Sequence, residues 1–266
     1  MGAKGLLGGA LAYSGVASVM RKPARAEGVT RGLLAPEPVK IDWKKYHWGF
    51  VCDDDKCIGC GRCVVACKKE NDVPWEPEYN RTWVERYVID EEGEFFVDSP
   101  NAGRDGFAAD YMNVKYEALD VRKSFFVPKL CNQCDNPPCV KVCPVGATYM
   151  TDDGVVLVDH GHCIGCRYCI QACPYGARFM LPRGHKSHFG VDRVIDKCNW
   201  CYHRIHRGLL PACVQACPVE ARLFGDLRDP ESVVSRITRE KRVYTLKPEL
   251  GTDPKVFYLG FEKGVH

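Results

Sequence analysis

Four cysteines within eleven residues constrain this chain more strongly than any other feature of its sequence. The segment HCIGCRYCIQACP, residues 162–174, has the spacing C-x2-C-x2-C-x3-C and a proline directly after the last cysteine. Related groups occur elsewhere in the chain. In chain order, group one is Cys57, Cys60, Cys63 and Cys67; group two is Cys131, Cys134, Cys139 and Cys143; group three is Cys163, Cys166, Cys169 and Cys173; and group four is Cys198, Cys201, Cys213 and Cys217.

This crowding favours bound metal over disulfides. The chain has 17 cysteines in 266 residues, whereas disulfide scaffolds are typical of short secreted chains. Structural zinc usually takes two C-x2-C pairs that lie well apart. Group four fits that pattern, so one zinc site there remains an alternative. Groups one and three place three thiols at i, i+3 and i+6, which is too crowded for one tetrahedral ion.

Iron–sulfur clusters explain the spacing better. A [4Fe–4S] cluster has four irons that each take one thiolate, and three cysteines of a tight loop can bind three of them. The run C-x2-C-x2-C-x3-C-P is typical of bacterial ferredoxins, in which the fourth cysteine binds the neighbouring cluster. Cys52 lies outside the groups. It is expected to be a buried core residue, because free cysteine packs as a small hydrophobic side chain.

The four groups resemble those of the four-cluster ferredoxin subunits of DMSO-reductase-type respiratory complexes, which include the iron–sulfur subunit of polysulfide reductase. The resemblance covers roughly residues 45–262 and includes CNQCDNPPCVKVCPVGATY, FGDLRDPES and LKPELGTDPKVFYL. It implies an α+β fold of two nested bacterial-ferredoxin-like units with a pseudo-two-fold relation. The implied parts are 27–68 with 183–226 (groups one and four), 124–182 (groups two and three), a β-hairpin insertion at 69–123 and a helix-and-strand tail at 227–266.

The resemblance also implies which cysteines share a cluster. Cys166 stands where some relatives lack a cysteine and hold a [3Fe–4S] cluster, so four [4Fe–4S] clusters are predicted. Lys68 stands where the other groups have a proline, and little effect is expected from it. The implied ligands are Cys57, Cys60, Cys63 and Cys217 for cluster 1; Cys198, Cys201, Cys213 and Cys67 for cluster 2; Cys131, Cys134, Cys139 and Cys173 for cluster 3; and Cys163, Cys166, Cys169 and Cys143 for cluster 4.

Alternation and turn residues predict several strands outside the groups. A short strand is expected at 49–52. Hairpins are expected at 82–98, across Glu-Glu-Gly, and at 147–159, across Asp-Asp-Gly. The segments 243–246 and 256–261 are expected to pair with each other as the last two strands.

A helix is predicted at the start of the tail. Asp229 would be its N-cap and Pro230 its first residue, since both residue types are favoured at those positions. Its apolar face would be formed by Val233, Val234 and Ile237.

Residues 1–26 are predicted to be a signal-like or anchor segment. Residues 5–20 are apolar but short for a membrane span, and Ala24-Arg25-Ala26 fits an A-x-A cleavage site. A buried N-terminal helix is the alternative. Only Lys4 precedes the apolar run, so a twin-arginine (Tat) signal requires an Arg-Arg pair encoded upstream of Met1. The expected location is the extracytoplasmic (periplasmic) face of the cytoplasmic membrane, through a partner or this anchor.

The formal charge of +3 comes from this segment, since its 26 residues contain four basic and no acidic side chains. The rest of the chain has 33 basic and 34 acidic residues. Four bound clusters of about −2 each would bring the net charge to about −9. No basic run or basic aromatic patch indicates a nucleic-acid partner.

No phosphate loop, nucleotide motif or nucleophile elbow is found, so the chain is predicted to be a non-catalytic electron-transfer subunit. By resemblance, its partners are an integral-membrane subunit of polysulfide-reductase type, reacting with a quinone such as menaquinone, and a cytochrome or catalytic redox subunit, in a hetero-oligomeric complex. RTWVERY, residues 81–87, favours the DsrO-type subunit of sulfate reducers. The alternatives are an iron–sulfur subunit of a molybdopterin-dependent polysulfide or tetrathionate reductase, and a soluble multi-cluster ferredoxin.

Overall fold

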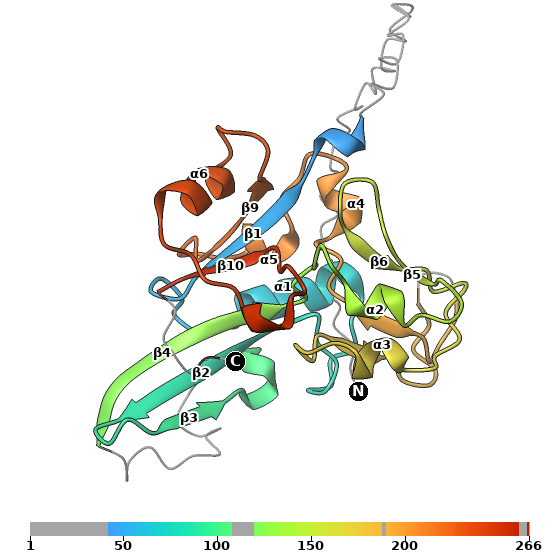
Figure 1. The fold of residues 1–266 in the computed structure, drawn as a ribbon. Coiled ribbons are helices and arrows are strands. Elements are labelled where there is room, and N and C mark those ends of the chain that lie inside the picture. Colours follow the sequence, from blue (N-terminus) through green and yellow to red (C-terminus); the bar gives the residue numbers. More distant parts are fainter. Residues whose placement is uncertain (1–41, 108–119, 188–189, 261–264, 266) are drawn as a thin grey trace, which may run out of the picture. The chain divides into compact units, whose positions relative to one another are not determined.

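The computed structural model describes residues 42–107, 120–187, 190–260 and 265. The signal-like segment predicted at 1–26 lies outside the described residues. The described chain combines small β-sheets with short helices (Figure 1), which confirms the predicted α+β class. No described helix has the length and hydropathy needed to cross a membrane.

A three-stranded sheet of order β10-β1-β9 joins the first and last described strands. β1 (Trp48–Asp53) confirms the first predicted strand. It pairs antiparallel with β9 (Arg222–Asp226) and parallel with β10 (Val256–Leu259). Cys52 lies on β1 and is fully buried, as predicted.

The predicted pairing of the last two strands is confirmed at one position only, and β10 has a longer partner. Tyr244 and Tyr258 form an isolated bridge, whereas β10 pairs in parallel along most of β1. Val256 and Tyr258 are fully buried in this position. Pairing with a central, buried strand removes more apolar surface from water than a local hairpin at the surface would. β10 therefore pairs along β1 on one edge and keeps only the bridge to Tyr244 on the other.

A second sheet has the order β3-β2-β4. β2 (Thr82–Asp90) and β3 (Phe95–Asp98) form the predicted hairpin, and β4 (Val121–Leu130) adds a strand that was not predicted on the other edge of β2. Arg86 and Asp98 form a bidentate ion pair across the hairpin, with Nε–Oδ1 and Nη2–Oδ2 distances of 2.9 and 2.6 Å. β4 ends directly before group two.

Short hairpins and helices carry the cysteine groups. β5 (Thr148–Met150) pairs with β6 (Val156–Val158), as predicted, and β7 (Arg178–Met180) pairs with β8 (Ile195–Lys197). The helices among them are α1 (Arg62–Asn71), α2 (Pro138–Lys141), α3 (Tyr168–Gln171), α4 (Tyr202–Ile205) and α5 (Ala212–Gln215). Short 3-10 turns lie at Trp43–Lys45, Pro100–Gly103 and Pro248–Leu250.

The tail helix α6 (Val233–Glu240) begins later than predicted, with Ser232 at its N-cap position. Asp229 forms a turn instead, since its carboxylate accepts a hydrogen bond of 2.9 Å from the backbone N–H two residues on. Val234 is fully buried, as predicted, but Val233 is exposed. Ile237 packs with Val234 against the cluster of Val51 and Leu259, so two of the three predicted residues form the buried face.

Candidate iron–sulfur sites

The helices bring the cysteine groups together in pairs. All seventeen cysteines lie in the described residues and are free thiols. α1, which carries Cys63 and Cys67, packs against α5 of group four, and α2 of group two packs against α3 of group three (Figure 1). This is the pairing of groups one with four and two with three that nested ferredoxin units would have.

Cysteines of groups two and three line one small cavity. They are Cys131, Cys134, Cys139 and Cys173, which together are the ligands implied for cluster 3. Burial raises the pKa of the Cys134 thiol to about 12, and the other three thiols add to the rise. Arg178 also lines the cavity, and its Nη2 atom lies 2.9 Å from Sγ of Cys139.

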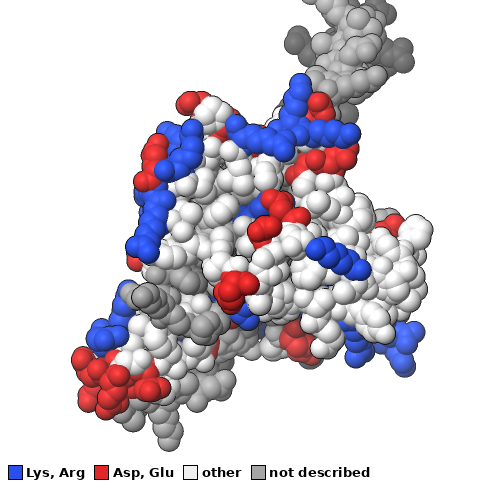
Figure 2. Space-filling view, in the orientation of Figure 1, with Lys and Arg blue, Asp and Glu red and all other residues white. Residues whose placement is uncertain are grey.

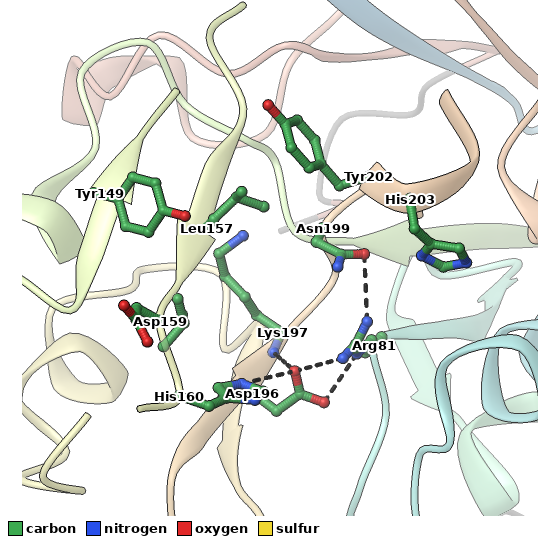
Figure 3. A pocket seen from close by; sticks show the side chains of 11 residues that line it. Arg81, Tyr149, Leu157, Asp159, His160, Asp196, Lys197, Asn199, Tyr202 and His203 are labelled. Atoms are coloured by element: carbon green, nitrogen blue, oxygen red, sulfur yellow. Dashed lines mark hydrogen bonds and ion pairs between the residues drawn. The ribbon is translucent and has the colours of Figure 1, made fainter. Parts of the chain in front are cut away.

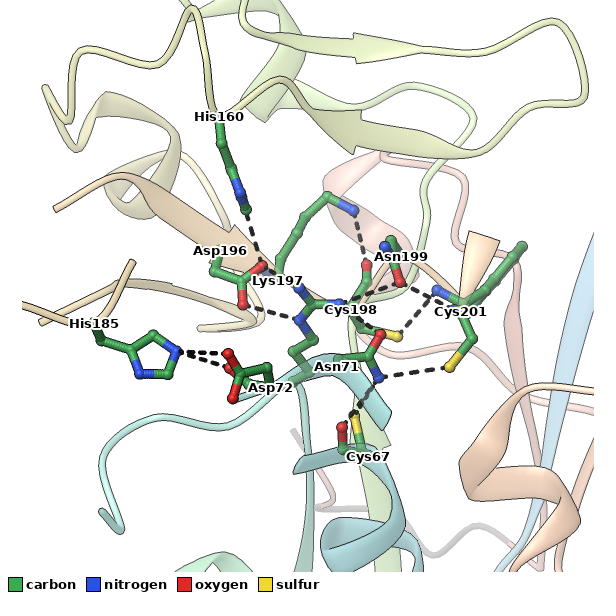
Figure 4. Close-up of polar contacts among 12 residues, drawn as sticks. Cys67, Asn71, Asp72, His160, His185, Asp196, Lys197, Cys198, Asn199 and Cys201 are labelled. Carbon is green, nitrogen blue, oxygen red and sulfur yellow. Dashed lines mark hydrogen bonds and ion pairs between the residues drawn. The ribbon is translucent and has the colours of Figure 1, made fainter. Parts of the chain in front are cut away.

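Cysteines of groups one and four lie together at the C-terminal end of α1 (Figure 4). The Nδ2 atom of Asn71 is 3.6 Å from Sγ of Cys67 and 3.6 Å from Sγ of Cys201. Burial raises the pKa of Cys67, and the thiols of Cys198, Cys213 and Cys201 raise it further. These four cysteines are the ligands implied for cluster 2.

The cysteines implied for cluster 1 are also neighbours. Burial raises the pKa of the Cys63 thiol, and Cys60 and Cys217 add to the rise. Burial raises the pKa of Cys57 to about 11, and Cys63 contributes to it. Cys217 of group four therefore lies beside thiols of group one.

For cluster 4 the structure brings fewer of the cysteines together. Burial raises the pKa of Cys169, and the thiols of Cys139, implied for cluster 3, and Cys163 add to the rise. Cys143 accepts a hydrogen bond of 3.4 Å from the N–H of Thr148. Burial opposes the ionisation of Cys143. The hydrogen bonds that its sulfur accepts from backbone N–H groups, including that of Thr148, outweigh burial and lower its pKa. Cys166 is exposed. The groups are linked by the packing of α2 against α3 and by an apolar cluster that contains Cys139 and Cys169.

Backbone N–H groups point at the thiols, which an iron–sulfur site requires. Such donors stabilise thiolate sulfur and help to set the reduction potential of a cluster. The donor–acceptor pairs, at N–Sγ distances between 3.3 and 3.5 Å, are Thr148 and Cys143, Ile195 and Cys163, Trp200 and Cys198, and Ala221 and Cys217. Among the residues described, no three or more His, Cys, Asp or Glu side chains have the geometry to hold a single metal ion.

The loop of group one needs glycine for this arrangement. Gly61 has φ of +71° at the start of α1, in the left-handed region that side chains disfavour. A Cβ atom there would lie 2.2 Å from the carbonyl oxygen of Arg104. The close approach of the two backbones leaves no space for a side chain.

Buried cations surround the thiols. Arg81, Arg178, Lys197 and Arg222 are at most 6% exposed, and each interacts electrostatically with cysteine thiols. Burying a cation is unfavourable unless an opposite charge lies nearby. A [4Fe–4S] cluster held by four thiolates carries negative charge, which would balance these cations. The thiols, the N–H donors and the cations therefore fit such a cluster.

A cavity of about 440 Å³ lies beside group four (Figure 3). Its wall contains an ion pair between Arg81 and Asp196, with N–O distances of 2.9 and 2.8 Å, and His160 lies 3.8 Å from Asp196. Arg81 also donates to Oδ1 of Asn71 at 2.9 Å. Because Asn71 contacts two predicted ligands of cluster 2, this network positions them relative to β8.

Lys68 contributes more than its place in the sequence suggests. Its side chain is buried, and Nζ donates to the carbonyl oxygens of Pro74, Glu76 and Tyr79 at 2.6, 3.1 and 2.6 Å. Burial lowers its pKa to about 8. This lysine ties the segment after α1 to the helix.

Five polar residues at these sites do not stand out in the cysteine spacing: Asn71, Arg81, Arg178, Lys197 and Arg222. One pattern in the chain nevertheless points to two of them. The segments CPYGAR at 173–178 and CPVEAR at 217–222 both place an arginine five residues after the last cysteine of a group. Arg178 and Arg222 are thus equivalent positions of a short repeat, and both are buried beside thiols.

Two family models match the chain, each described as a 4Fe-4S dicluster domain, at residues 56–147 and 122–227. A tetrathionate reductase subunit of Salmonella typhimurium is 40% identical over 220 residues, which are 82% of this chain and 74% of that protein. The chain belongs to this family of iron–sulfur subunits. A putative dimethyl sulfoxide reductase iron–sulfur subunit of Halobacterium salinarum is 40% identical over 81% of this chain and 80% of its own. The Hdr-like menaquinol oxidoreductase iron–sulfur subunit 1 of Archaeoglobus fulgidus is 33% identical over 86% of this chain and 88% of its own.

This iron–sulfur subunit is therefore an electron-transfer protein with [4Fe–4S] clusters, and not a catalytic subunit. The predicted family, the class of cofactor and the non-catalytic role are confirmed. Neither disulfides nor zinc accounts for the main use of its cysteines.

Proposed function

We propose that this iron–sulfur subunit carries four [4Fe–4S] clusters and relays electrons between a membrane quinone-reactive subunit and another redox subunit of a respiratory complex. The observation that carries the proposal is the cavity lined by Cys131, Cys134, Cys139 and Cys173. It places three cysteines of one group beside the last cysteine of another, as in ferredoxins whose fourth cysteine binds the neighbouring cluster.

Four clusters account for sixteen of the cysteines, and two matched dicluster domains have room for the same number. A zinc ion in group four is disfavoured because Cys67 of group one lies among the group four thiols. The proposed ligands are Cys57, Cys60, Cys63 and Cys217; Cys198, Cys201, Cys213 and Cys67; Cys131, Cys134, Cys139 and Cys173; and Cys163, Cys166, Cys169 and Cys143.

When bound, the clusters supply one-electron carriers. The chain's own residues hold them in place. Cysteine thiolates bind iron, backbone N–H groups face the sulfur atoms, and Asn71 spaces Cys67 from Cys201. The buried cations balance negative charge without exposing the site to water.

Two exposed cysteines mark the places where partners would approach. Cys60 and Cys166 are exposed, whereas the other thiols are buried or half-buried. Beside them, Ile58 and Ile164 are 56% and 65% exposed. An apolar side chain next to an exposed ligand suits contact with another subunit, because the contact would shield both from water.

A further exposed apolar surface lies over α2 and the β5–β6 hairpin, which Figure 2 shows as mostly uncharged. Val142, Val145, Tyr149 and Met150 are all exposed there. This surface adjoins Cys143, a proposed ligand of cluster 4. A redox subunit that docked here would reach the same end of the chain of clusters as one at Cys166.

Two kinds of complex are candidates. The relative named as an Hdr-like menaquinol oxidoreductase subunit, together with RTWVERY, supports a menaquinone-linked complex of sulfate reduction with a DsrO-type subunit. The relatives named for tetrathionate and dimethyl sulfoxide reductases support a molybdopterin-dependent reductase instead. The signal-like segment at 1–26 supports the periplasmic face of the membrane, and Tat export of the folded protein, for the first candidate.

Purification from native membranes in mild detergent tests the proposal. We expect about sixteen irons and sixteen sulfides per chain, four for each [4Fe–4S] cluster, and a membrane quinone-reactive subunit identified by mass spectrometry. Co-purifying cytochrome and heterodisulfide-reductase-like subunits would select the sulfate-reduction complex. A molybdopterin subunit would select the reductase. A single polypeptide without stable partners would overturn the relay between subunits.

A further inference from the structure

Arg222 lies in the core between the thiols of groups one and four. It begins β9 and stands opposite Cys52 of β1. It is 2% exposed. The residue before it, Ala221, donates its N–H to Sγ of Cys217 at 3.3 Å. The backbone that precedes Arg222 therefore contacts a proposed ligand of cluster 1.

No carboxylate among the described residues pairs with this cation. Neither terminal nitrogen of Arg222 has an oxygen acceptor within hydrogen-bonding distance. The buried carboxyl nearby is Asp54, which has no hydrogen-bond partner of its own. Burial, assisted by Asp53 and Asp55, raises the pKa of Asp54 to about 8, so it is mostly uncharged near neutral pH.

Two other buried arginines among the described residues are paired with carboxylates. Arg81 contacts Asp196 at 2.8 and 2.9 Å, and Arg86 contacts Asp98 at 2.6 and 2.9 Å. Arg222 instead has thiols as its charge partners, in the order Cys63, Cys213, Cys52 and Cys57. Cys63 and Cys57 are proposed for cluster 1 and Cys213 for cluster 2, whereas Cys52 lies outside the ligand sets. A buried guanidinium without a charged carboxylate partner is stabilised when the thiols beside it are anionic.

We propose that Arg222 is the counter-charge shared by clusters 1 and 2 and that it raises the reduction potentials of both. The inference rests on the ligand sets proposed above. Reduction adds one electron and no proton to a cluster, so the site becomes more negative by one charge. A fixed positive charge nearby stabilises the reduced form more than the oxidised form. Arg178, at the equivalent repeat position, would act in the same way on cluster 3, since it contacts Cys139 at 2.9 Å.

The test is a potentiometric titration of the holo-protein followed by EPR, with the wild type and three variants. Arg222→Met removes the charge and keeps much of the side-chain length, Arg222→Lys keeps the charge, and Arg178→Met removes an equally buried arginine at the other position of the repeat. We expect Arg222→Met to lower the reduction potentials of two of the four clusters by at least about 59 mV each. For a one-electron couple this is a tenfold change in the equilibrium constant of reduction. Arg222→Lys should stay near the wild type, and Arg178→Met should shift a different signal.

Four clusters with unchanged potentials in Arg222→Met would overturn the inference. So would a lysine variant that shifts as far as the methionine variant, since packing and not charge would then be responsible. If the Arg222→Met variant does not bind its clusters, the Arg222→Lys variant tests the inference instead. A loaded lysine variant with wild-type potentials supports the counter-charge, and one that also fails to load contradicts it. A wild-type protein with fewer than four clusters would instead overturn the ligand sets of the proposed function.

Discussion

Cys173 and Cys131 belong to different cysteine groups, yet their thiols line the same cavity, and the Cys131 thiol contributes to the raised pKa of Cys173 after burial. Cys173 follows α3, whereas Cys131 directly follows β4. The two groups therefore share a site that neither forms alone.

Cys173→Ser should remove this shared cluster. Serine is a much poorer iron ligand than a thiolate, so we expect iron to fall by about four atoms per chain and one EPR signal to disappear. Cys52→Ala is the control, since Cys52 is a fully buried thiol that lies outside the proposed ligands. It should keep its full iron content. Loss of iron in the control alone would contradict the assignment.

Asp196→Asn should destabilise the protein strongly. The change leaves the buried Arg81 guanidinium without its carboxylate, which now lies at 2.8 and 2.9 Å. Breaking one side of a buried ion pair typically costs about 3–5 kcal/mol. Anaerobic thermal unfolding should show a clearly lower Tm. Arg193→Gln breaks an exposed contact of 3.5 Å and should change stability by less than about 0.5 kcal/mol. Equal effects of the two variants would argue against the role of the Arg81 network.

Gly61→Ala should impair loading of cluster 1. The new Cβ atom would lie 2.2 Å from the Arg104 carbonyl oxygen, so the loop of group one must move. Gly93→Ala is the control, because Gly93 also has a positive φ, of +88°, but no atom lies within 4 Å of the position that a Cβ would take there. Both variants carry left-handed strain of about 1–2 kcal/mol. Iron content should fall only for Gly61→Ala, and similar losses in both would show that strain alone is responsible.

Asp54→Asn should increase the stability of the protein relative to the wild type, and this increase should grow as the pH rises. Burial raises the pKa of Asp54 from 3.8 to about 8, so between these values the folded state binds more protons than the unfolded state. The wild type therefore loses stability as the pH rises towards 8, and asparagine removes this loss. The difference in Tm between variant and wild type should grow from pH 6 to pH 8 and level off above it. A difference independent of pH would contradict the buried, protonated carboxyl.

The spacing of residues close together in the sequence predicted the cofactor and several strands of this protein. The C-x2-C-x2-C-x3-C runs predict the class of cofactor because the ligands of one loop lie within a dozen residues. The first strand and the two hairpins at 82–98 and 147–159 follow from alternation and turn residues, which are also local. The start of α6 was misplaced because the Asp229 carboxylate binds a backbone N–H in a turn, an alternative that competes with the helix.

Tertiary structure decided the contacts between distant segments. The partner of β10, the position of Arg222 opposite Cys52, and the three carbonyl groups bound by Lys68 depend on where the chain returns to the core. A cysteine or a hairpin is recognised by its neighbours in sequence. A buried cation looks like any surface arginine or lysine in the sequence, because its role is set by the charges that folding places around it.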